Sequence, residues 1–453
     1  MTVLRHVPAL LLLLVHLACA SGAPSPVPSA PAATPATLAT PSATTPARSA
    51  PTASPAPSAG PSAMVSAAPA AAPAPPDSPL KGLEQLHAAM PQDGTVMYLL
   101  AYFKGEAGDR DAVYQWLDAL ARSSWDLGLD DSDFKMVAAE PRYQDLARTL
   151  NGRVTTVADA PVAFRLAERD LIPEGIAYDS KRKELLLGSL KKRKIIRIRP
   201  GGGVSEVIAP AAGGMGRVLG LRVDPGRDVL WVAADKTKDG QPPAPRAIYR
   251  FALANGALLG SYALPDGGRH LLNDLAVTGD GTVFVTDSEG GGVFRLKPGA
   301  TALEPFIPAG SMVYPNGIAL DAAGRTLYVA DAAGIWSVDP ESGAHRRLQP
   351  SPGVTIGGID GLSMDGTDFI AVQNMGSSPR LARMTLDAAA GRVTAVKVLA
   401  SKHPEFEIPT TAALVGAEAY VIANSQLRSK DETGQYLPPE RLKEPVILRV
   451  RVR

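Results

Sequence analysis

The sequence has 453 residues, of which 46 are basic and 45 acidic, so its formal net charge at pH 7 is +1. A chain so balanced, without a basic stripe, gives no electrostatic reason to expect nucleic acid as a partner. Glycine accounts for 43 residues and aromatic residues for only 5% of the chain, a composition that suits an all-β fold with many turns.

The N-terminus has the features of an export signal over residues 1–20. Arg5 supplies a positive charge, and the run "ALLLLLVHLACA" is apolar but too short to span a membrane as a mature helix. Cys19, the only cysteine, stands where a lipoprotein signal is acylated, whereas cleavage after Ala20 would release a secreted form. We therefore expect a periplasmic or cell-envelope lipoprotein anchored to a membrane through Cys19, with secretion as the alternative. Either form lacks an internal disulfide bond.

Residues 20–79 consist almost entirely of Ala, Pro, Ser and Thr. Without bulky apolar side chains the segment cannot offset the entropy that it would lose on ordering. It is predicted to be a disordered linker between the N-terminus and the folded part of the chain.

Residues 80–155 are predicted to form a small helical module. Apolar residues recur there at three- and four-residue spacings, as in amphipathic helices, and Asp109 is placed to cap one of these helices. The run "DAVYQWLDALARSSWDLGLDDSDFKMVAAEPRYQDL" resembles degenerate tetratricopeptide-like units. The resemblance implies either a cap on the rest of the protein or a docking module for a protein partner.

An acidic cluster lies within this module. We interpret it as a solvated turn that caps helices, with a metal site as the alternative. Its members are Asp130, Asp131 and Asp133.

From about residue 160 the chain changes to short strands separated by Gly, Asp and Pro turns. Six similar units each contain a leading residue, a strand, a turn and an apolar strand, and the leading residues follow one another at intervals of 46, 53, 43, 44 and 51 residues. These leading residues are Glu174, Gly220, Asn273, Asn316, Asp360 and Thr411. Six repeats of this length predict a mainly β protein with a six-bladed β-propeller over residues 160–453. The strands "VAFRL" at 162–166 and "VILRVRVR" at the C-terminus are expected to build one blade together.

The leading residues of a propeller's innermost strands meet at one end of its axis. Glu174, Asn273, Asn316 and Asp360 would bring two carboxylates and two amide oxygens together there. Such hard oxygen ligands suit Ca²⁺, with other divalent cations possible, whereas zinc prefers thiolate and imidazole ligands that these positions lack. The alternative is that these side chains only satisfy backbone groups in turns.

Four segments carry a resemblance to a known family: "PEGIAYD", "NDLAVTGDGTVFVTD", "PNGIALDAAGRTLYVAD" and "IDGLSMD". They resemble the gluconolactonase, senescence marker protein and luciferin-regenerating enzyme family, and more distantly the paraoxonases. The resemblance covers residues 160–453 and implies a hydrolase of lactones or small esters with one catalytic divalent ion, usually calcium. It implies that the metal ligands are Glu174, Asn273, Asn316 and Asp360. It also implies that Asp360 is the catalytic residue that orients or deprotonates the attacking water.

The sequence departs from this family where the substrate would bind. Leu271 stands where gluconolactonases often carry an arginine that contacts a sugar acid, and the second blade lacks the histidine base of paraoxonases. The remaining candidates for substrate binding are Arg217, His270, Thr411 and His403. The alternative for the two histidines is that they are simply solvated.

Two main classes of function remain open. One is a metal-dependent hydrolase, in which water attacks directly, because the sequence contains neither a G-x-S-x-G nor an H-E-x-x-H motif and no usable catalytic cysteine. The other is a non-catalytic binding propeller with a structural calcium ion, in which the helical module docks a partner. A propeller with other chemistry, as in the related strictosidine synthases, is a third possibility.

Overall fold

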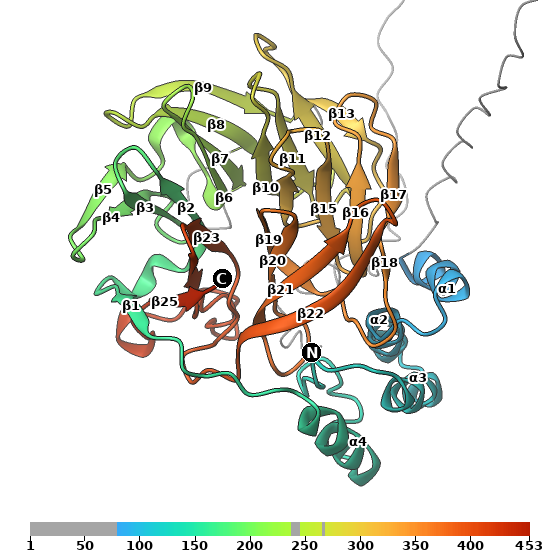
Figure 1. The fold of residues 1–453 in the computed structure, drawn as a ribbon. Coiled ribbons are helices and arrows are strands. Elements are labelled where there is room, and N and C mark those ends of the chain that lie inside the picture. The colour runs from blue at the N-terminus through green and yellow to red at the C-terminus, as the bar shows by residue number, and fades with distance from the viewer. Residues whose placement is uncertain (1–78, 237–244, 265–267) are drawn as a thin grey trace, which may run out of the picture. The chain divides into compact units, whose positions relative to one another are not determined.

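The computed structural model describes residues 79–236, 245–264 and 268–453. The predicted signal, the acylation site at Cys19 and the linker lie outside these residues. A helical segment is followed by six small β-sheets arranged around an axis (Figure 1). The prediction of a mainly β, six-bladed propeller with a preceding helical segment is confirmed. No helix in the described part of the chain is both long and apolar enough to cross a membrane.

Four α-helices precede the propeller. They are α1 (Pro79–Ala89), α2 (Gly94–Glu106), α3 (Arg110–Arg122) and α4 (Pro141–Gly152). The Asp93 carboxylate accepts hydrogen bonds from the backbone N–H groups of Thr95 and Val96 at the start of α2. Asp109 accepts one from Ala112 at the start of α3, as predicted. These caps pair amides that have no partner within the helix.

Each of the first five blades is an antiparallel sheet whose first strand is innermost. Blade 1 consists of β2 (Pro173–Asp179), β3 (Glu184–Ser189), β4 (Ile195–Ile198) and β5 (Val204–Ile208). Blade 2 consists of β6 (Arg217–Asp224), β7 (Val229–Asp235), β8 (Ala247–Ala252) and β9 (Leu258–Ala263). Blade 3 consists of β10 (Leu272–Val277), β11 (Val283–Asp287), β12 (Gly292–Leu296) and β13 (Glu304–Ile307). Blade 4 consists of β14 (Ile318–Leu320), β15 (Leu327–Asp331), β16 (Gly334–Val338) and β17 (His345–Arg347). Blade 5 consists of β19 (Ile359–Asp365), β20 (Asp368–Gln373), β21 (Arg380–Asp387) and β22 (Arg392–Ser401), with the short β18 (Gln349–Pro350) parallel to β22.

Blade 6 is built from both ends of the propeller sequence. Its strands are β23 (Ala412–Val415), β24 (Glu418–Ile422), β25 (Val446–Arg451) and β1 (Val162–Arg165). Strand β1 pairs antiparallel with β25, with Val162 opposite Leu448 and Arg165 opposite Val446. The predicted closure of the ring by the two terminal strands is confirmed. This pairing joins the two ends of the propeller sequence within one sheet.

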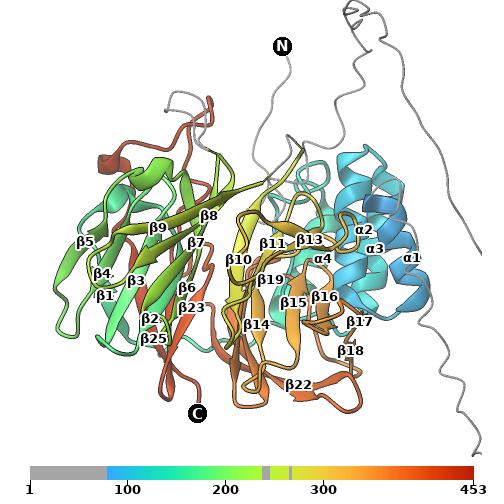
Figure 2. The same ribbon diagram turned by 90° about the horizontal axis from the view of Figure 1, so that it is seen from above.

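The helical segment packs against the propeller, beside blades 4 and 5 (Figures 1 and 2). A single apolar cluster contains residues of α2 and α3 together with propeller residues such as Leu271. Two ion pairs join the parts: Arg380 to Asp126 at 2.7 Å and Arg428 to Asp130 at 3.1 Å. The helices and the propeller belong to one compact unit, so the helical segment forms a cap on the propeller.

The acidic turn between α3 and α4 differs from the prediction at one residue. Asp130 pairs with Arg428 and Asp131 is exposed, but Asp133 is buried and accepts a hydrogen bond from the Tyr98 hydroxyl at 2.6 Å. The interpretation as a solvated turn is therefore wrong for Asp133, because the neighbouring helix α2 covers it. Burial, with a further contribution from the charge of Asp130, raises the pKa of Asp133 to about 7.

Candidate functional site

Several of the predicted leading residues are the first residue of a bulge that recurs in the innermost strands. In blade 1 the pairing of β2 with β3 shifts, so that Glu174 and Gly175 together lie opposite one residue of β3. The same shift occurs at Asn273 in β10 and at Asp360 in β19. In blade 2 the first residue of this bulge is Leu219, so the prediction of Gly220 as the leading residue is wrong by one position. Asn316 lies just before β14, and its backbone N–H donates to β15 at 2.8 Å. A bulge bends its strand and redirects the side chains at that point, which explains why strand-disfavouring residues lead these strands.

Glycine follows several leading residues because the next blade occupies the space of a side chain. A Cβ atom at Gly175 would lie 2.0 Å from the carbonyl oxygen of Leu219, and one at Gly317 would lie 2.6 Å from the carbonyl oxygen of Asp360. In blade 3 this position is Asp274, whose carboxylate is buried and accepts a hydrogen bond from a backbone amide of β14 at 3.3 Å. Each innermost strand therefore contacts the next one around the ring.

Asp360 is held on both of its carboxylate oxygens. Asn316 Nδ2 donates to Oδ1 at 2.7 Å, and Asn374 Nδ2 donates to Oδ2 at 2.5 Å. Asn374 directly follows β20, and sequence reasoning missed it because it does not lead a strand. In blade 5, Asn374 occupies the same position after the second strand as Ser288 does after β11 in blade 3. Ser288 accepts a hydrogen bond from Asn273 at 3.0 Å. The signal that would have found Asn374 is therefore a polar residue just after the second strand.

Glu174 and Asp360 form a buried pair of carboxylates at the axis. The exposed fraction is 5% for Glu174 and 4% for Asp360, and Glu174 Oε2 has no hydrogen-bond partner. Burial, and then the nearby charges of Asp360 and Asp274, raise the pKa of Glu174 well above its usual value. Burial also raises the pKa of Asp360, although the hydrogen bonds from the two asparagines oppose the shift. Carboxylates that are so costly to ionise are typical of functional sites, and a bound cation would reverse the cost.

The two asparagines of the predicted metal set use their nitrogen atoms as donors. Asn273 donates to Ser288, whose hydroxyl donates to the Pro315 carbonyl oxygen at 2.6 Å, and Asn316 donates to Asp360. The amide oxygens are therefore the atoms left to bind a cation. In the described part of the chain, no three His, Cys, Asp or Glu side chains gather as a metal site. The predicted set is of a different kind, since it combines two carboxylates with two amides.

Thr411 and Arg217, two of the candidate substrate-binding residues, make structural contacts. The Thr411 hydroxyl donates to the backbone carbonyl of Glu174 at 2.6 Å, which joins blade 6 to blade 1. Arg217 begins β6 and forms an ion pair with Asp235.

Both candidate histidines are buried and bonded, so neither is solvated. His270 Nδ1 lies 2.5 Å from Asp287 Oδ2, in the loop before β10. His403 Nε2 lies 3.0 Å from the backbone carbonyl oxygen of Ala160. The structure therefore places His270 three residues before Asn273, and it places His403 against the segment that enters β1.

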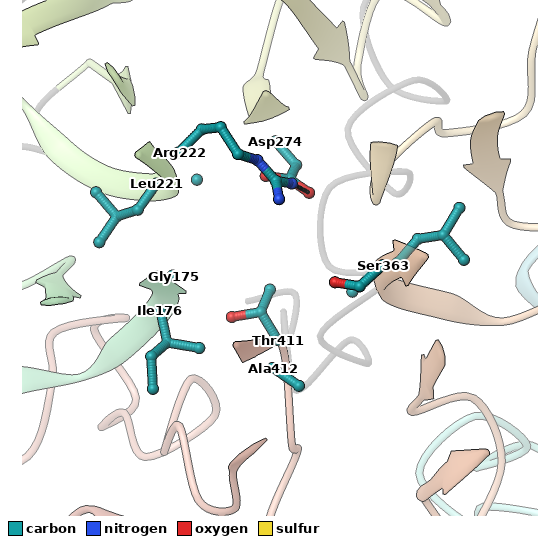
Figure 3. Close-up of a pocket in the computed structure, with 11 residues that line it drawn as sticks. Gly175, Ile176, Leu221, Arg222, Asp274, Ser363, Thr411 and Ala412 are labelled. Atoms are coloured by element: carbon teal, nitrogen blue, oxygen red, sulfur yellow. Dashed lines mark ion pairs between the residues drawn. The ribbon is translucent and has the colours of Figure 1, made fainter. Parts of the chain in front are cut away.

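Beyond the leading residues the axis continues as a narrow channel (Figure 3). Arg222, Asp274, Ser363 and Thr411 line it, and its volume is about 20 Å³, room for about one water molecule. The Arg222 guanidinium lies 3.6 Å from the Asp274 carboxylate and also donates to the carbonyl oxygen of Leu275 at 2.8 Å. A substrate has no room on this side of the leading residues.

Apolar residues surround the axis on the other side. Ile172, Leu271 and Tyr314 each stand two residues before a leading residue, and all three are buried in the cluster that contains the helices. Ile172 and Tyr314 have positive φ angles of 48° and 53°, which are rare for such side chains. Strain of this kind costs on the order of 1–3 kcal/mol and is found where function requires it. The fold therefore holds Ile172 and Tyr314, two of the three residues of this apolar ring, in place against their backbone preference.

The chain is similar to one family model and to several solved structures. The family model described as "SMP-30/Gluconolactonase/LRE-like region" matches residues 172–419, which include the four predicted metal ligands. No curated protein matches the chain. A solved gluconolactonase from Xanthomonas campestris is 18% identical, with a TM-score of 0.44, over 65% of this chain and 96% of that chain. The calcium-binding protein regucalcin from Agrobacterium tumefaciens is 16% identical, with a TM-score of 0.45, over 66% and 98% of the two chains. Virginiamycin B lyase from Staphylococcus aureus is 18% identical, with a TM-score of 0.42, over 57% and 80%.

Proposed function

Since the chain belongs to the SMP-30/gluconolactonase/LRE-like family, we propose that it is a metal-dependent hydrolase of lactones or small esters. One observation carries the proposal. Glu174 and Asp360 are buried together at the axis, burial raises the pKa of both, and one Glu174 oxygen has no hydrogen-bond partner. A cation would complete this arrangement.

Four residues would hold the ion: Glu174, Asn273, Asn316 and Asp360. Their oxygen atoms suit Ca²⁺, and other divalent cations are possible. When bound, such an ion would polarise the substrate carbonyl and lower the pKa of water.

Asp360 is the residue that we propose to accept a proton from the attacking water. Asn316 and Asn374 each hold one of its oxygens, so the carboxylate keeps a fixed orientation toward the axis. The water oxygen bonds to the carbonyl carbon, the C–O bond of the lactone or ester breaks, and the proton passes to the departing alkoxide. No side chain forms a covalent intermediate.

The residues of the apolar ring argue against a sugar acid as the substrate, and the helical segment that covers them would have to move for a substrate to reach them. Leu271 takes the place of the family's arginine and is buried, with an exposed fraction of 2%. Arg217 shares the Asp235 carboxylate with Arg246, which holds its guanidinium within blade 2. We therefore place lactones and esters with apolar side groups ahead of sugar lactones.

We also propose export of the protein, with Cys19 acylated or the chain secreted. The apolar N-terminal run and the position of the single cysteine support this. Metabolic labelling with palmitate tests it: we expect label in the membrane fraction of cells that express the full chain and none after Cys19→Ser. Absence of label from the wild type would exclude the lipid anchor, and label that persists in the Cys19→Ser variant would show that the acyl chain is attached to another residue.

The packing of the helical cap over the apolar ring favours a second candidate function. In that case the propeller is a non-catalytic binding protein, the ion is structural and the helical segment also docks a protein partner. Calcium would then raise the melting temperature without supporting turnover of any ester.

A panel of lactones and esters, assayed with calcium-stripped and calcium-loaded protein, separates the two. We expect calcium-dependent turnover that falls about 10²–10⁴-fold in Asp360→Asn, because a positioned general base contributes that much. Asp321→Asn is the matched control, since among the described residues the Asp321 side chain accepts a hydrogen bond only from the Arg325 amide, in the turn after β14. If no compound is hydrolysed while calcium still stabilises the fold, the binding function is the correct one.

A further inference from the structure

A second cavity lies between the outer strands of blades 2 and 3, which are neighbours in the ring (Figure 1). Its volume is about 420 Å³, within the range of small-molecule sites. Trp231, Arg250 and Tyr262 of blade 2 form one wall, and the turn at 297–301 between β12 and β13 forms the other. None of the leading residues at the axis lines this groove, so it is separate from the candidate active site.

Two side chains at the groove have unpaired donors. Trp231 is 4% exposed, and its Nε1 is buried without an acceptor. Arg250 Nε is buried without an acceptor as well. Both nitrogen atoms are closed off from solvent, so a ligand in the groove would meet the Arg250 guanidinium at its terminal nitrogens, which are not buried in this way.

Arg250 also supplies an unbalanced charge. Within the residues that the structure describes, no carboxylate pairs with its guanidinium, which lies 5.7 Å from the centre of the Trp231 ring. The other cation of the groove, Lys297, lies 3.2 Å from the Glu304 carboxylate, which Arg295 shares at 2.7 Å. The groove therefore carries an excess of positive charge, which suits an anionic ligand such as a carboxylate.

The remaining surface is suited to a flat apolar group. The rings of Trp231 and Tyr262 lie 5.9 Å apart with an angle of 37° between them, and Leu296 and Ala300 line the opposite side. Aromatic rings attract one another at such separations, so an apolar ring of a ligand can pack against these two side chains in the same way.

We propose that this groove binds a small organic carboxylate that carries a flat apolar ring. The carboxylate pairs with the terminal nitrogens of the Arg250 guanidinium, whose planar donors suit it. The ring of the ligand packs between Tyr262 and the turn of blade 3. The groove is thus a second ligand site, whose occupancy does not depend on the chemistry at the axis.

Calorimetric titration of the purified protein with benzoate tests the proposal. A chelator is present throughout, so that no metal ion at the axis binds the carboxylate. Benzyl alcohol, of similar size but uncharged, is the reference probe. We expect saturable binding of one benzoate per chain and at least about tenfold weaker binding of benzyl alcohol, because a hydrogen bond to a charged group contributes about 1.5–3 kcal/mol.

Variants assign the binding to the groove. We expect Arg250→Gln to weaken benzoate binding about tenfold or more, and Arg325→Gln, which removes an exposed charge from a turn of blade 4, to change it less than about twofold. If Arg250→Gln does not fold, Ala300→Phe replaces it, since the larger side chain fills the groove without removing a donor, and binding should then be lost. The proposal is overturned if benzoate does not saturate a site, or if the folded groove variant binds it as the wild type does.

Discussion

At the scale of single residues, the orientation of Asp360 depends on two amide groups from different blades. Asn316 belongs to blade 4, whereas Asn374 follows the second strand of blade 5, and each donates to one carboxylate oxygen. Because the two donors act on opposite oxygens, both are needed to stop the carboxylate from turning. Asn374, which is not among the proposed metal ligands, acts on the site through Asp360.

Replacing Asn374 with alanine tests this role. Partners that orient metal ligands typically change metal affinity 10–100-fold, so we expect Asn374→Ala to weaken calcium binding by about tenfold or more, measured by calorimetry. Asn255→Ala is the control, because Asn255 is exposed and only accepts a hydrogen bond within a turn of blade 2. Equal calcium affinity of the two variants would show that Asn374 does not position Asp360.

Asp133 makes stability depend on pH. Burial raises its folded-state pKa from 3.8 to about 7, so the carboxyl group is protonated more readily in the folded protein. Its contribution to stability is complete below about pH 4 and is lost as the pH rises through 7. Asp133→Asn keeps an acceptor for the Tyr98 hydroxyl without a charge. We expect the free energy of unfolding in urea to rise on the order of 2–4 kcal/mol at pH 8.5 relative to wild type.

The same comparison at low pH provides the control for Asp133. Near pH 4 the wild-type carboxyl group is neutral in the folded state, so the two proteins should be equally stable within about 0.5 kcal/mol. A stability difference that does not change between pH 4 and 8.5 would contradict burial as the cause.

At the scale of strands, the glycine after a leading residue allows neighbouring blades to touch. In Gly175→Ala the new Cβ would lie 2.0 Å from the Leu219 carbonyl oxygen, a backbone atom that cannot rotate away. We expect the free energy of unfolding to fall by about 1–3 kcal/mol or more, the usual cost of overpacking. Gly279→Ala, where a Cβ meets nothing within 4 Å, should change it little. Similar urea midpoints for the two variants would show that the ring can expand.

The strands could be predicted because the residues of each repeat form most of one blade, so that the pattern within a repeat is enough to locate its strands. Alternating apolar segments and Asp or Gly turns predicted six units, and the unpaired terminal strand predicted the closure between β1 and β25. The bulges could not be predicted, because a shift in pairing depends on the neighbouring strand and leaves no distinct pattern in residues such as Glu174 and Gly175. The same limit applies to Asn374 and to the burial of His270, which depend on contacts between segments far apart in the sequence.

At the scale of the whole molecule, the cap and the propeller meet at a buried arginine. Arg380 is 1% exposed; its Nε donates to Gln373 at 2.8 Å within blade 5, and its NH1 group donates to Asp126 in the cap at 2.7 Å. Removing one partner of a buried ion pair costs about 3–5 kcal/mol. The Asp126 side chain is 35% exposed, so water would recover part of that cost and the loss should fall below this range.

Arg380→Met therefore loosens the cap before it unfolds the propeller. We expect amide hydrogen exchange in α2 and α4 to accelerate about tenfold or more, while exchange in β2 and β3 stays unchanged. The reason is that the free energy of local opening depends only on the contacts that hold the opening part in place. Arg148→Met is the matched control, since its partner Asp145 lies on the same exposed face of α4. Equal acceleration in the helices and in blade 1 would show instead that the two parts open as one cooperative unit, with the apolar ring around the axis as their shared core.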